Sequence, residues 1–252
     1  MIGIIKGDVR YTYLSQILDN SILSDSLKDF NNIDILILPL TGINSNLIIK
    51  QTNINILDIL KANSIKAIIT GNANNELIDL CKKYNIKLYE LLKDSEFINQ
   101  NAFLTAKGAL YLIHNGICDI KDKSVLIIGY GNISFHIAKL LTEQKCEFDI
   151  YTENILEKKF SSLEGYKNID SINEAYDIVI NTIPNNLDID YFIFKDSIIY
   201  DLASMPYGFK IEEIEEKRID YRILSNIPSK YAPKSAAIII KKFIENKIFP
   251  CM

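Results

Sequence analysis

The feature that most constrains this chain is an apolar run that ends in two closely spaced glycines. Residues 124–128 read Ser-Val-Leu-Ile-Ile, and the next three residues are Gly129, Tyr130 and Gly131. Apolar side chains at helical spacing follow directly: Ile133, Ile137, Ala138 and Leu141. A buried strand, a tight turn and a helix in this order are typical of a parallel α/β sheet.

This strand–turn–helix segment also predicts a dinucleotide-binding loop. The first glycine of such a loop makes the turn, the second lets the backbone approach a pyrophosphate, and the helix start supplies N–H groups. We expect five residues to hold the cofactor: Gly129, Tyr130, Gly131, Asn132 and Ile133. Ser134 replaces the third glycine of the G-x-G-x-x-G fingerprint, so the match is imperfect.

Short apolar runs alternate with helical patterns along the rest of the chain. Strands are expected at residues 2–5, 35–38, 67–70, 87–89, 124–128, 148–152, 178–181, 198–201 and 221–224. Helices are expected at residues 9–20, 53–62, 74–84, 101–116, 132–144, 171–175, 211–217 and 233–246. This alternation predicts parallel sheets with helices on both faces, and the strands are more than one doubly wound sheet usually needs.

We therefore expect an α/β fold of two parallel-sheet domains joined by a long helix. Residues 1–100 form the predicted N-terminal substrate domain, 101–117 the connecting helix, and 118–232 a Rossmann-type dinucleotide-binding domain. The last segment, 233–252, is predicted as a helix that packs back across the domain junction. Its apolar stripe consists of Ala236, Ile239, Ile240 and Phe243.

Composition argues against several function classes. The net charge is −4 and no basic block stands out, which disfavours nucleic-acid binding. With two histidines and no C-x-x-C, no metal site is expected. We interpret the four scattered cysteines as reduced thiols: Cys81, Cys118, Cys146 and Cys251. No signal-peptide pattern and no apolar run of ~18 residues is present, which predicts a cytoplasmic protein without membrane contact.

The end of the strand after the glycine loop usually carries an acidic residue that binds the adenosine ribose. Here residues 148–152 are followed by Glu153 and Asn154, so we expect Thr152, Glu153 and Asn154 to contact the cofactor. A carboxylate accepts hydrogen bonds from a ribose diol and repels a 2′-phosphate, which favours NAD. The alternative is that Glu153 is a solvated loop residue.

Two helix starts carry cations where the helix dipole disfavours them. At the first, Asp8 is placed as an N-cap and Arg10 lies in the first turn. At the second, Lys230 and Lys234 flank a helix that begins at Pro233. Two such starts in different domains would together hold a small dianion. The alternative is solvated lysines and an arginine paired with a neighbouring carboxylate.

Two further loops follow strands of the predicted dinucleotide-binding domain. Ligands of open α/β sheets bind at the carboxyl ends of strands, so these loops should face the nicotinamide and the substrate. They contain Asn181, Thr182, Ile183 and Pro184 in one case, and Asp201, Leu202, Ala203 and Ser204 in the other. The two histidines, His114 and His136, lie on predicted helices, and we interpret both as structural.

Two dehydrogenase families with this architecture do not match in detail. A D-2-hydroxy acid dehydrogenase relies on a histidine late in the dinucleotide domain, and none follows His136. A shikimate dehydrogenase needs a Lys–Asp pair after an Asn/Thr/Pro motif, which the sequence lacks.

The chain resembles the family of dipicolinate synthase A subunits over nearly its whole length. Six motifs in order carry the resemblance: Gly7-Asp8-x-Arg10, Asn101-Ala102-x-x-Thr105-Ala106-x-Gly108-Ala109, Gly129-x-Gly131, Asn181-Thr182-Ile183-Pro184, Asp201-Leu202-Ala203-Ser204 and Pro228-x-Lys230-x-Ala232-Pro233-Lys234. The chain departs from the family pattern at four positions: Lys6, Lys107, Ser134 and Glu153. The family tends to have an arginine at the last of these, which suits NADP, so the resemblance leaves NAD or NADP open.

The resemblance implies a sporulation dehydrogenase of dipicolinic acid biosynthesis. It would oxidise a dihydrodipicolinate-type precursor to pyridine-2,6-dicarboxylate with NAD or NADP, beside the flavoprotein-like B subunit of dipicolinate synthase, in the mother-cell cytoplasm of a spore former. The implied substrate-binding residues are Asp8, Arg10, Asn101, Lys230, Lys234 and Ser235. The candidate catalytic residues are Thr105, Asp201 and Ser204.

Two other functions stay open at this point. One is a different NAD(P)-dependent small-acid dehydrogenase or reductase on the same scaffold. The other is a dinucleotide-binding subunit without catalysis of its own. The sequence also leaves the oligomeric state open, with a homo-oligomer as one option.

Overall fold

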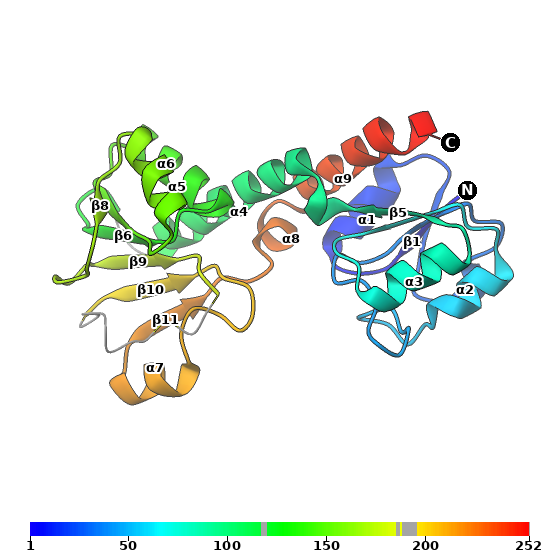
Figure 1. Cartoon of the computed structure of the whole chain (residues 1–252), viewed down its shortest axis with the longest axis horizontal. Coiled ribbons are helices and arrows are strands. Elements are labelled where there is room, and N and C mark those ends of the chain that lie inside the picture. Colours follow the sequence, from blue (N-terminus) through cyan, green and yellow to red (C-terminus); the bar gives the residue numbers. More distant parts are fainter. Residues whose placement is uncertain (117–119, 185–186, 188–195, 252) are drawn as a thin grey trace. The chain divides into compact units, whose positions relative to one another are not determined.

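The computed structural model describes residues 1–116, 120–184, 187 and 196–251. The chain divides into two compact units, shown in Figure 1. Unit 1 contains Met1–Asn101 and Pro228–Met252, and unit 2 contains Ala102–Ile227. The predicted domain limits at 100, 117 and 232 stay predictions, and residue 117 lies outside the described residues.

The described residues of unit 1 form a five-stranded parallel sheet in the order β2-β1-β3-β4-β5. The strands are β1 (Ile2–Ile5), β2 (Ser21–Ser24), β3 (Ile35–Ile37), β4 (Ala67–Thr70) and β5 (Lys87–Glu90). The strands β1, β3 and β4 are buried along their whole length, as expected for a parallel sheet covered on both faces. In the register, Gly3 lies opposite Ile22 of β2 and Leu36 of β3.

Helices cover this sheet, and asparagine or aspartate begins several of them. They are α1 (Val9–Ile17), α2 (Ile56–Ala62), α3 (Asn75–Lys83) and α9 (Pro233–Lys247), with 3-10 turns at Leu27–Asp29, Leu91–Lys93 and Phe249–Cys251. Asp8, Asn55 and Asn74 each accept a backbone N–H of the following helix, which satisfies a donor that the helix start leaves open. The C-terminal helix α9 packs on α1 within unit 1. Its predicted packing across the domain junction stays a prediction.

The described residues of unit 2 form a six-stranded parallel sheet in the order β11-β10-β9-β6-β7-β8. The strands are β6 (Val125–Ile128), β7 (Phe148–Tyr151), β8 (Asn168–Ile169), β9 (Ile178–Asn181), β10 (Ile198–Asp201) and β11 (Asp220–Ile223). The strand order reverses between β6 and β9, which is the topological switch point where such sheets bind ligands. The predicted fold class of two parallel-sheet α/β units is confirmed, and the second has Rossmann topology.

The core of unit 2 lies on both faces of β6 because its side chains alternate. Val125 and Ile127 belong to one apolar cluster, and Leu126 and Ile128 belong to another. The first cluster also contains residues from α4 (Ser95–Gly116) and α5 (Asn132–Glu143). The other helices of this unit are α6 (Ile155–Leu163) and α7 (Ile211–Lys217). The short helix α8 (Ile227–Tyr231) begins at the last residue of unit 2.

The long helix α4 starts about one and a half turns earlier than predicted. Asp94 caps it by accepting the Phe97 N–H at 2.9 Å. Its first seven residues are counted in unit 1 and the rest in unit 2. The prediction began later because it followed the apolar stripe of Ala106, Leu110 and Ile113, whereas the buried Phe97 in the first turn already belongs to the helix.

The structure corrects several predicted elements. Residues 171–175 form no helix, and α6, α8, β2 and β8 were not predicted. The strands β2 and β8 lie at sheet edges and are half-exposed, so they lack an apolar run. The apolar residues of α6 face solvent and show no core-facing pattern: Ile155, Leu156, Phe160 and Leu163.

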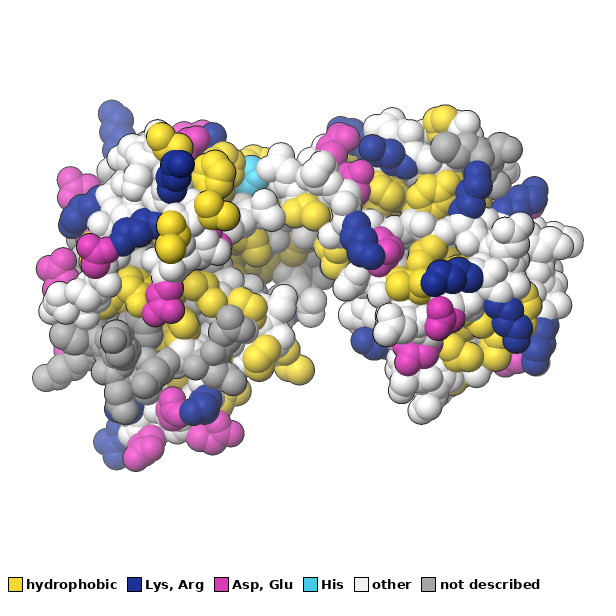
Figure 2. Space-filling view, in the orientation of Figure 1, with side chains coloured by type: hydrophobic (Ala, Val, Ile, Leu, Met, Phe, Trp, Pro, Cys, Tyr) yellow, Lys and Arg dark blue, Asp and Glu magenta, His cyan; other side chains and the backbone are white. Residues whose placement is uncertain are grey.

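The described part of the chain contains neither a candidate metal site nor a candidate membrane span. On the face drawn in Figure 2, cationic and acidic side chains are interspersed on both units. No helix among the described residues is long and apolar enough to cross a membrane. The same residues contain no cluster of His, Cys, Asp or Glu that could hold a metal. Cys81 and Cys146 are buried free thiols, and burial raises the pKa of Cys81 to about 11; Cys118 lies outside the described residues.

Candidate functional site

The glycine loop between β6 and α5 combines a forced turn with an open helix start. Gly129 has φ +88°, and a Cβ there would lie 2.7 Å from a side-chain carbon of Ile183 and 2.8 Å from Thr182 Oγ1. Any other residue would therefore be strained and would clash. A Cβ on Gly131, by contrast, would meet no atom within 4 Å. The second glycine thus borders open space at the surface.

The start of α5 has the properties of an anion site. Gly131 is its N-cap, and neither a side-chain cap nor an acidic residue occupies its first turn. The first backbone N–H groups of a helix have no partner within the helix, and the dipole favours a negative charge there. These residues fit the pyrophosphate of a dinucleotide. The loop and the first turn contain all five predicted contacts of this kind, Gly129 to Ile133.

Ser134, which departs from the fingerprint, is buried beneath the loop. Its Oγ lies 2.7 Å from Thr182 Oγ1, and Thr182 Oγ1 donates to the Ile128 carbonyl at 2.9 Å. Because the Thr182 proton is already used, Ser134 is the donor in this pair. The hydroxyl therefore ties α5 to the end of β9 without entering the open space beside Gly131.

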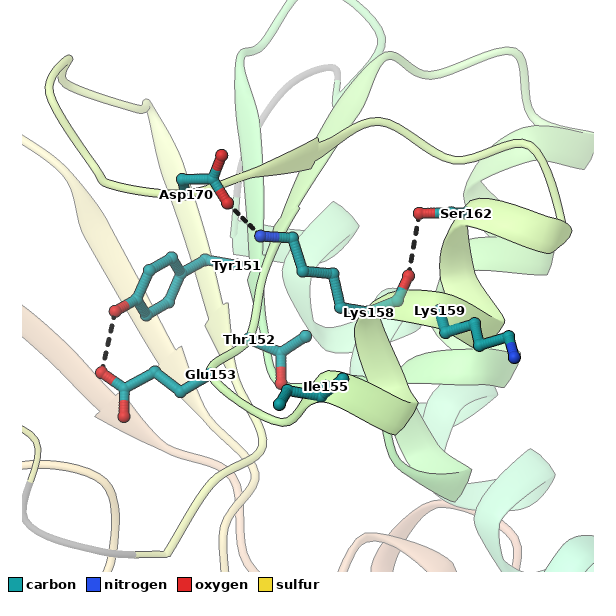
Figure 3. A pocket seen from close by; sticks show the side chains of 8 residues that line it. All are labelled: Tyr151, Thr152, Glu153, Ile155, Lys158, Lys159, Ser162 and Asp170. Atoms are coloured by element: carbon teal, nitrogen blue, oxygen red, sulfur yellow. Dashed lines mark hydrogen bonds and ion pairs between the residues drawn. The ribbon is translucent and has the colours of Figure 1, made fainter.

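The predicted ribose-binding residue, Glu153, lies beside a surface pocket at the end of β7. Tyr151 Oη donates to Glu153 Oε1 at 3.0 Å, as Figure 3 shows. The pocket has a volume of about 550 Å³ and is lined by Tyr151, Thr152, Glu153, Ile155, Lys158, Lys159, Ser162 and Asp170. Lys158 forms an ion pair with Asp170, and Lys159 points away from Glu153 in Figure 3.

A second carboxylate, Glu157, contacts the glycine loop itself, and no local sequence pattern predicts this contact. Its Oε2 accepts the Tyr130 N–H at 2.8 Å and the Thr152 hydroxyl at 2.7 Å. Thr152, a predicted cofactor contact, is buried, and Asn154 caps α6 by accepting two backbone N–H groups. Glu157 was missed because the sequence pattern did not predict α6, the helix that brings Glu157 to the glycine loop.

The loops after β9 and β10 are joined by a buried hydrogen-bond network around Asp201. Its Oδ1 accepts from Asn181 Nδ2 at 3.0 Å and from the Ala203 N–H at 2.8 Å. Its Oδ2 accepts from the Gly208 N–H at 2.7 Å and from Tyr221 Oη. Asp201 is fully buried. Four donors on two oxygens favour a structural role over the predicted role as a base.

Other predicted residues lie on the same loops. The Leu202 N–H donates to the Asn181 carbonyl at 2.9 Å, and Ser204 is exposed. Thr182 and Pro184 are partly buried. Burial raises the pKa of Tyr221, and its hydrogen bond to Asp201 adds to the shift. Tyr221 therefore stays a neutral donor.

In unit 1, Asp8 fixes the Arg10 guanidinium. Asp8 caps α1 through the Arg10 N–H at 3.1 Å, and its two oxygens accept from Arg10 Nε at 2.8 and 3.0 Å. The Arg10 side chain is 5% exposed. The predicted alternative, an arginine paired with a neighbouring carboxylate, is thus what the structure shows. Only Nε is used in this pair, and no described residue accepts from the two Nη atoms.

Tyr11, beside Arg10, has a buried hydroxyl without a hydrogen-bond partner in the described structure. Burial raises the pKa of Tyr11, so the phenol is neutral. Its ring lies against the turn at Gly7, where a Cβ would be 3.0 Å away. A side chain at position 7 would therefore press on the Tyr11 ring.

The remaining predicted substrate residues lie on three helices. Lys234 is in the first turn of α9, with Nζ 5.4 Å from the centre of the Tyr13 ring. Ser235 follows it, and Lys230 is exposed on α8. Both α9 and residue 230 belong to unit 1 with Arg10, so the two cationic helix starts that were expected in different domains lie in one unit. On α4, Asn101 is the last residue of the N-terminal segment of unit 1. Thr105 lies one turn later on the same helix, belongs to unit 2 and is buried.

The histidines have structural surroundings. His114 Nδ1 lies 2.7 Å from the Leu110 carbonyl on its own helix. His136 packs edge-on against Phe103 and Phe135. These contacts agree with the structural interpretation of both residues.

Comparison with known proteins agrees with this geometry. No protein-family model matches the chain. It is 25% identical over 235 residues to the A subunit of dipicolinate synthase from Bacillus subtilis (strain 168), covering 84% of this chain and 76% of that protein. The crystal structure of the corresponding protein from Bacillus halodurans has a TM-score of 0.77 and 21% identity, covering 97% of this chain and 96% of that one.

A more distant likeness is to a D-isomer specific 2-hydroxyacid dehydrogenase from Lactobacillus delbrueckii ssp. bulgaricus, solved in its NAD-complexed form. Its TM-score is 0.58 with 13% identity, covering 97% of this chain and 95% of that one. The predicted resemblance is confirmed: the chain is similar in sequence and in fold to the A subunit of dipicolinate synthase. The likeness to the 2-hydroxyacid dehydrogenase is one of fold.

Proposed function

We propose that the chain is a dehydrogenase that forms dipicolinate from a dihydrodipicolinate-type precursor, as one subunit of a synthase. The observation that carries the proposal is the open glycine loop at the uncapped start of α5, in a chain similar to the dipicolinate synthase A subunit over 235 residues. The reaction removes two hydrogens from the ring. One leaves as a hydride to a nicotinamide cofactor and the other as a proton to solvent.

Unit 2 is the proposed dinucleotide-binding unit. The backbone around Gly131, Asn132 and Ile133 would hold the pyrophosphate, and the loops after β9 and β10 would hold the nicotinamide end at the carboxyl edge of the sheet. The bound cofactor supplies the hydride acceptor. Asp201 would act by keeping Asn181 and the two loops in place, because its oxygens are already occupied by donors.

Unit 1 is the proposed source of cations for the two substrate carboxylates. Asp8 holds Arg10 by Nε, which leaves the Nη atoms for a charge-assisted pair with a carboxylate. Lys230, Lys234 and Ser235 would bind the second carboxylate, and Asn101 would add an amide. Aromatisation of the ring favours the oxidation, so a water ordered by Thr105 or Ser204 is sufficient to take the proton.

Partner and location follow from the resemblance and are proposals as well. We place the protein in the mother-cell cytoplasm of a spore former, where it would act beside the flavoprotein-like B subunit of dipicolinate synthase. Its cofactor would be NAD or NADP.

The test combines the purified chain, its proposed flavoprotein-like partner, a dihydrodipicolinate source and NAD or NADP. We expect dipicolinate to form, and Arg10→Lys to lower kcat/KM by about tenfold or more because a bidentate pair is lost. The matched control is Lys66→Ala, a cation of unit 1 that pairs with Asp34 near the amino ends of the strands. Absence of dipicolinate in every combination, with dinucleotide binding confirmed, would refute the proposal.

A further inference from the structure

The Glu157 carboxylate lies between the glycine loop and the end of strand β7, because it contacts Tyr130 on one side and Thr152 on the other. Its two donors, the Tyr130 N–H and the Thr152 hydroxyl, both bind Oε2. Oε1 accepts no hydrogen bond from any described residue. Tyr130 lies between the two glycines, so this carboxylate borders the loop that the dinucleotide would contact. Glu157 is half-buried, and both of its donors come from buried residues.

Glu153, the residue at the expected position, faces elsewhere. Its described hydrogen bond is with Tyr151 Oη, which is on its own strand end. Figure 3 shows the pair on the side of the pocket toward the neighbouring strands, with the carboxylate turned away from α6. Glu153 is also exposed, so its charge is screened by water more than that of Glu157.

We infer that Glu157, from the first turn of α6, binds the adenosine ribose and selects NAD over NADP. This inference rests on the proposed function only in requiring that the loop bind a dinucleotide. The unused Oε1 would accept a ribose hydroxyl, and the charge would repel a 2′-phosphate. Of the two lysines on the same helix that line the neighbouring pocket, Lys158 is already paired with Asp170 and is not free to neutralise a 2′-phosphate.

The test is a calorimetric titration of the full chain with NADH and with NADPH. Glu157→Gln keeps a carbonyl oxygen for Tyr130 and Thr152 but removes the charge. We expect the wild type to prefer NADH by about tenfold or more, and Glu157→Gln to lower that preference about fivefold or more. Glu153→Gln, the matched control, should change the preference by less than about twofold.

The ratio of the two affinities separates selection from a purely structural role. Glu157→Asp keeps the charge and should keep the preference for NADH while weakening both cofactors. The inference would be overturned if Glu157→Gln weakened the binding of NADH and NADPH equally. It would also be overturned if only Glu153→Gln changed the ratio of the two affinities. If the folded wild type bound neither cofactor, both this inference and the dinucleotide part of the proposed function would fail. If the wild type bound a dinucleotide but Glu157→Gln left the ratio of the two affinities unchanged, this inference alone would be refuted.

Discussion

At the scale of single residues, Asp201 shows most clearly how the structure favours a structural role where the sequence predicts a catalytic one. Its place at the carboxyl end of β10 predicts a base, yet the carboxylate is buried and accepts four hydrogen bonds. Gly208 approaches so closely that a Cβ there would lie 1.9 Å from Asn181 Nδ2. The network therefore determines the path of both loops at the carboxyl edge of the sheet.

We predict that Asp201→Asn destabilises the protein by about 2–3 kcal/mol, because the new amide would place a donor against the donors of Gly208 and Tyr221. Urea unfolding followed by circular dichroism measures this. The control is Asp220→Asn, an exposed partner of Arg222, for which about 0–1 kcal/mol is expected. A variant as stable as the wild type but without turnover would instead support the catalytic role of Asp201.

Residue types and order were sufficient to predict the glycine loop, but not which carboxylate borders it. The loop needs only local geometry, since Gly129 must adopt a positive φ and Gly131 must leave space. Glu157 reaches the loop from a helix with solvent-facing apolar residues, and no local pattern indicates that. Arg10 was singled out by its conflict with the helix dipole, and the structure shows that Asp8 resolves part of this conflict.

At the scale of secondary-structure elements, burial explains why the central strands were predictable. Every predicted strand is present within one residue at each end, and the central ones are the continuous apolar runs that a buried parallel strand needs. The half-exposed edge strands β2 and β8 were missed, whereas the edge strands β5 and β11 were predicted. Helix α6 was missed because its apolar residues face solvent and form no core-facing stripe. The helix expected at 171–175 is wrong, because those residues only connect β8 to β9.

Asp177 ties the starts of β6 and β9 and makes their pairing sensitive to pH. It accepts the Ser124 N–H at 2.8 Å and the Ser124 hydroxyl at 2.9 Å. The backbone hydrogen bond from Ser124, helped by Lys123, holds the pKa of this carboxyl below its usual value. A lowered folded-state pKa stabilises the protein above the unfolded-state pKa of about 3.9, and this contribution is lost as pH falls through the folded-state value.

Asp177→Ala should therefore lower the free energy of unfolding by about 1 kcal/mol at neutral pH, a small value because the side chain is 45% exposed. The difference from wild type should shrink as the pH falls below about 4. Urea unfolding across this pH range is the measurement, with exposed Asp122→Ala as the control that should show neither effect. A difference that grows at acid pH would contradict the assignment.

At the scale of the whole molecule, two parallel-sheet units are combined in one chain, and each has a distinct chemical character. Unit 2 carries the glycine loop at the start of α5, near the topological switch point. Unit 1 contains a buried arginine whose Nη atoms are available to an anion, and Lys234 lies in the same unit. Motif order was sufficient to predict this family resemblance, because six short motifs in sequence are far more specific than any one of them.

The most direct test of the proposed function is whether the glycine loop binds a nicotinamide dinucleotide. Gly131→Val adds a side chain that meets no protein atom at its Cβ but would overlap a pyrophosphate. We predict that calorimetric titration with NAD shows an affinity at least about 100-fold weaker for the variant, while its melting temperature stays within about 4 °C of the wild type. Equal affinity in the two proteins would contradict the placement of the site.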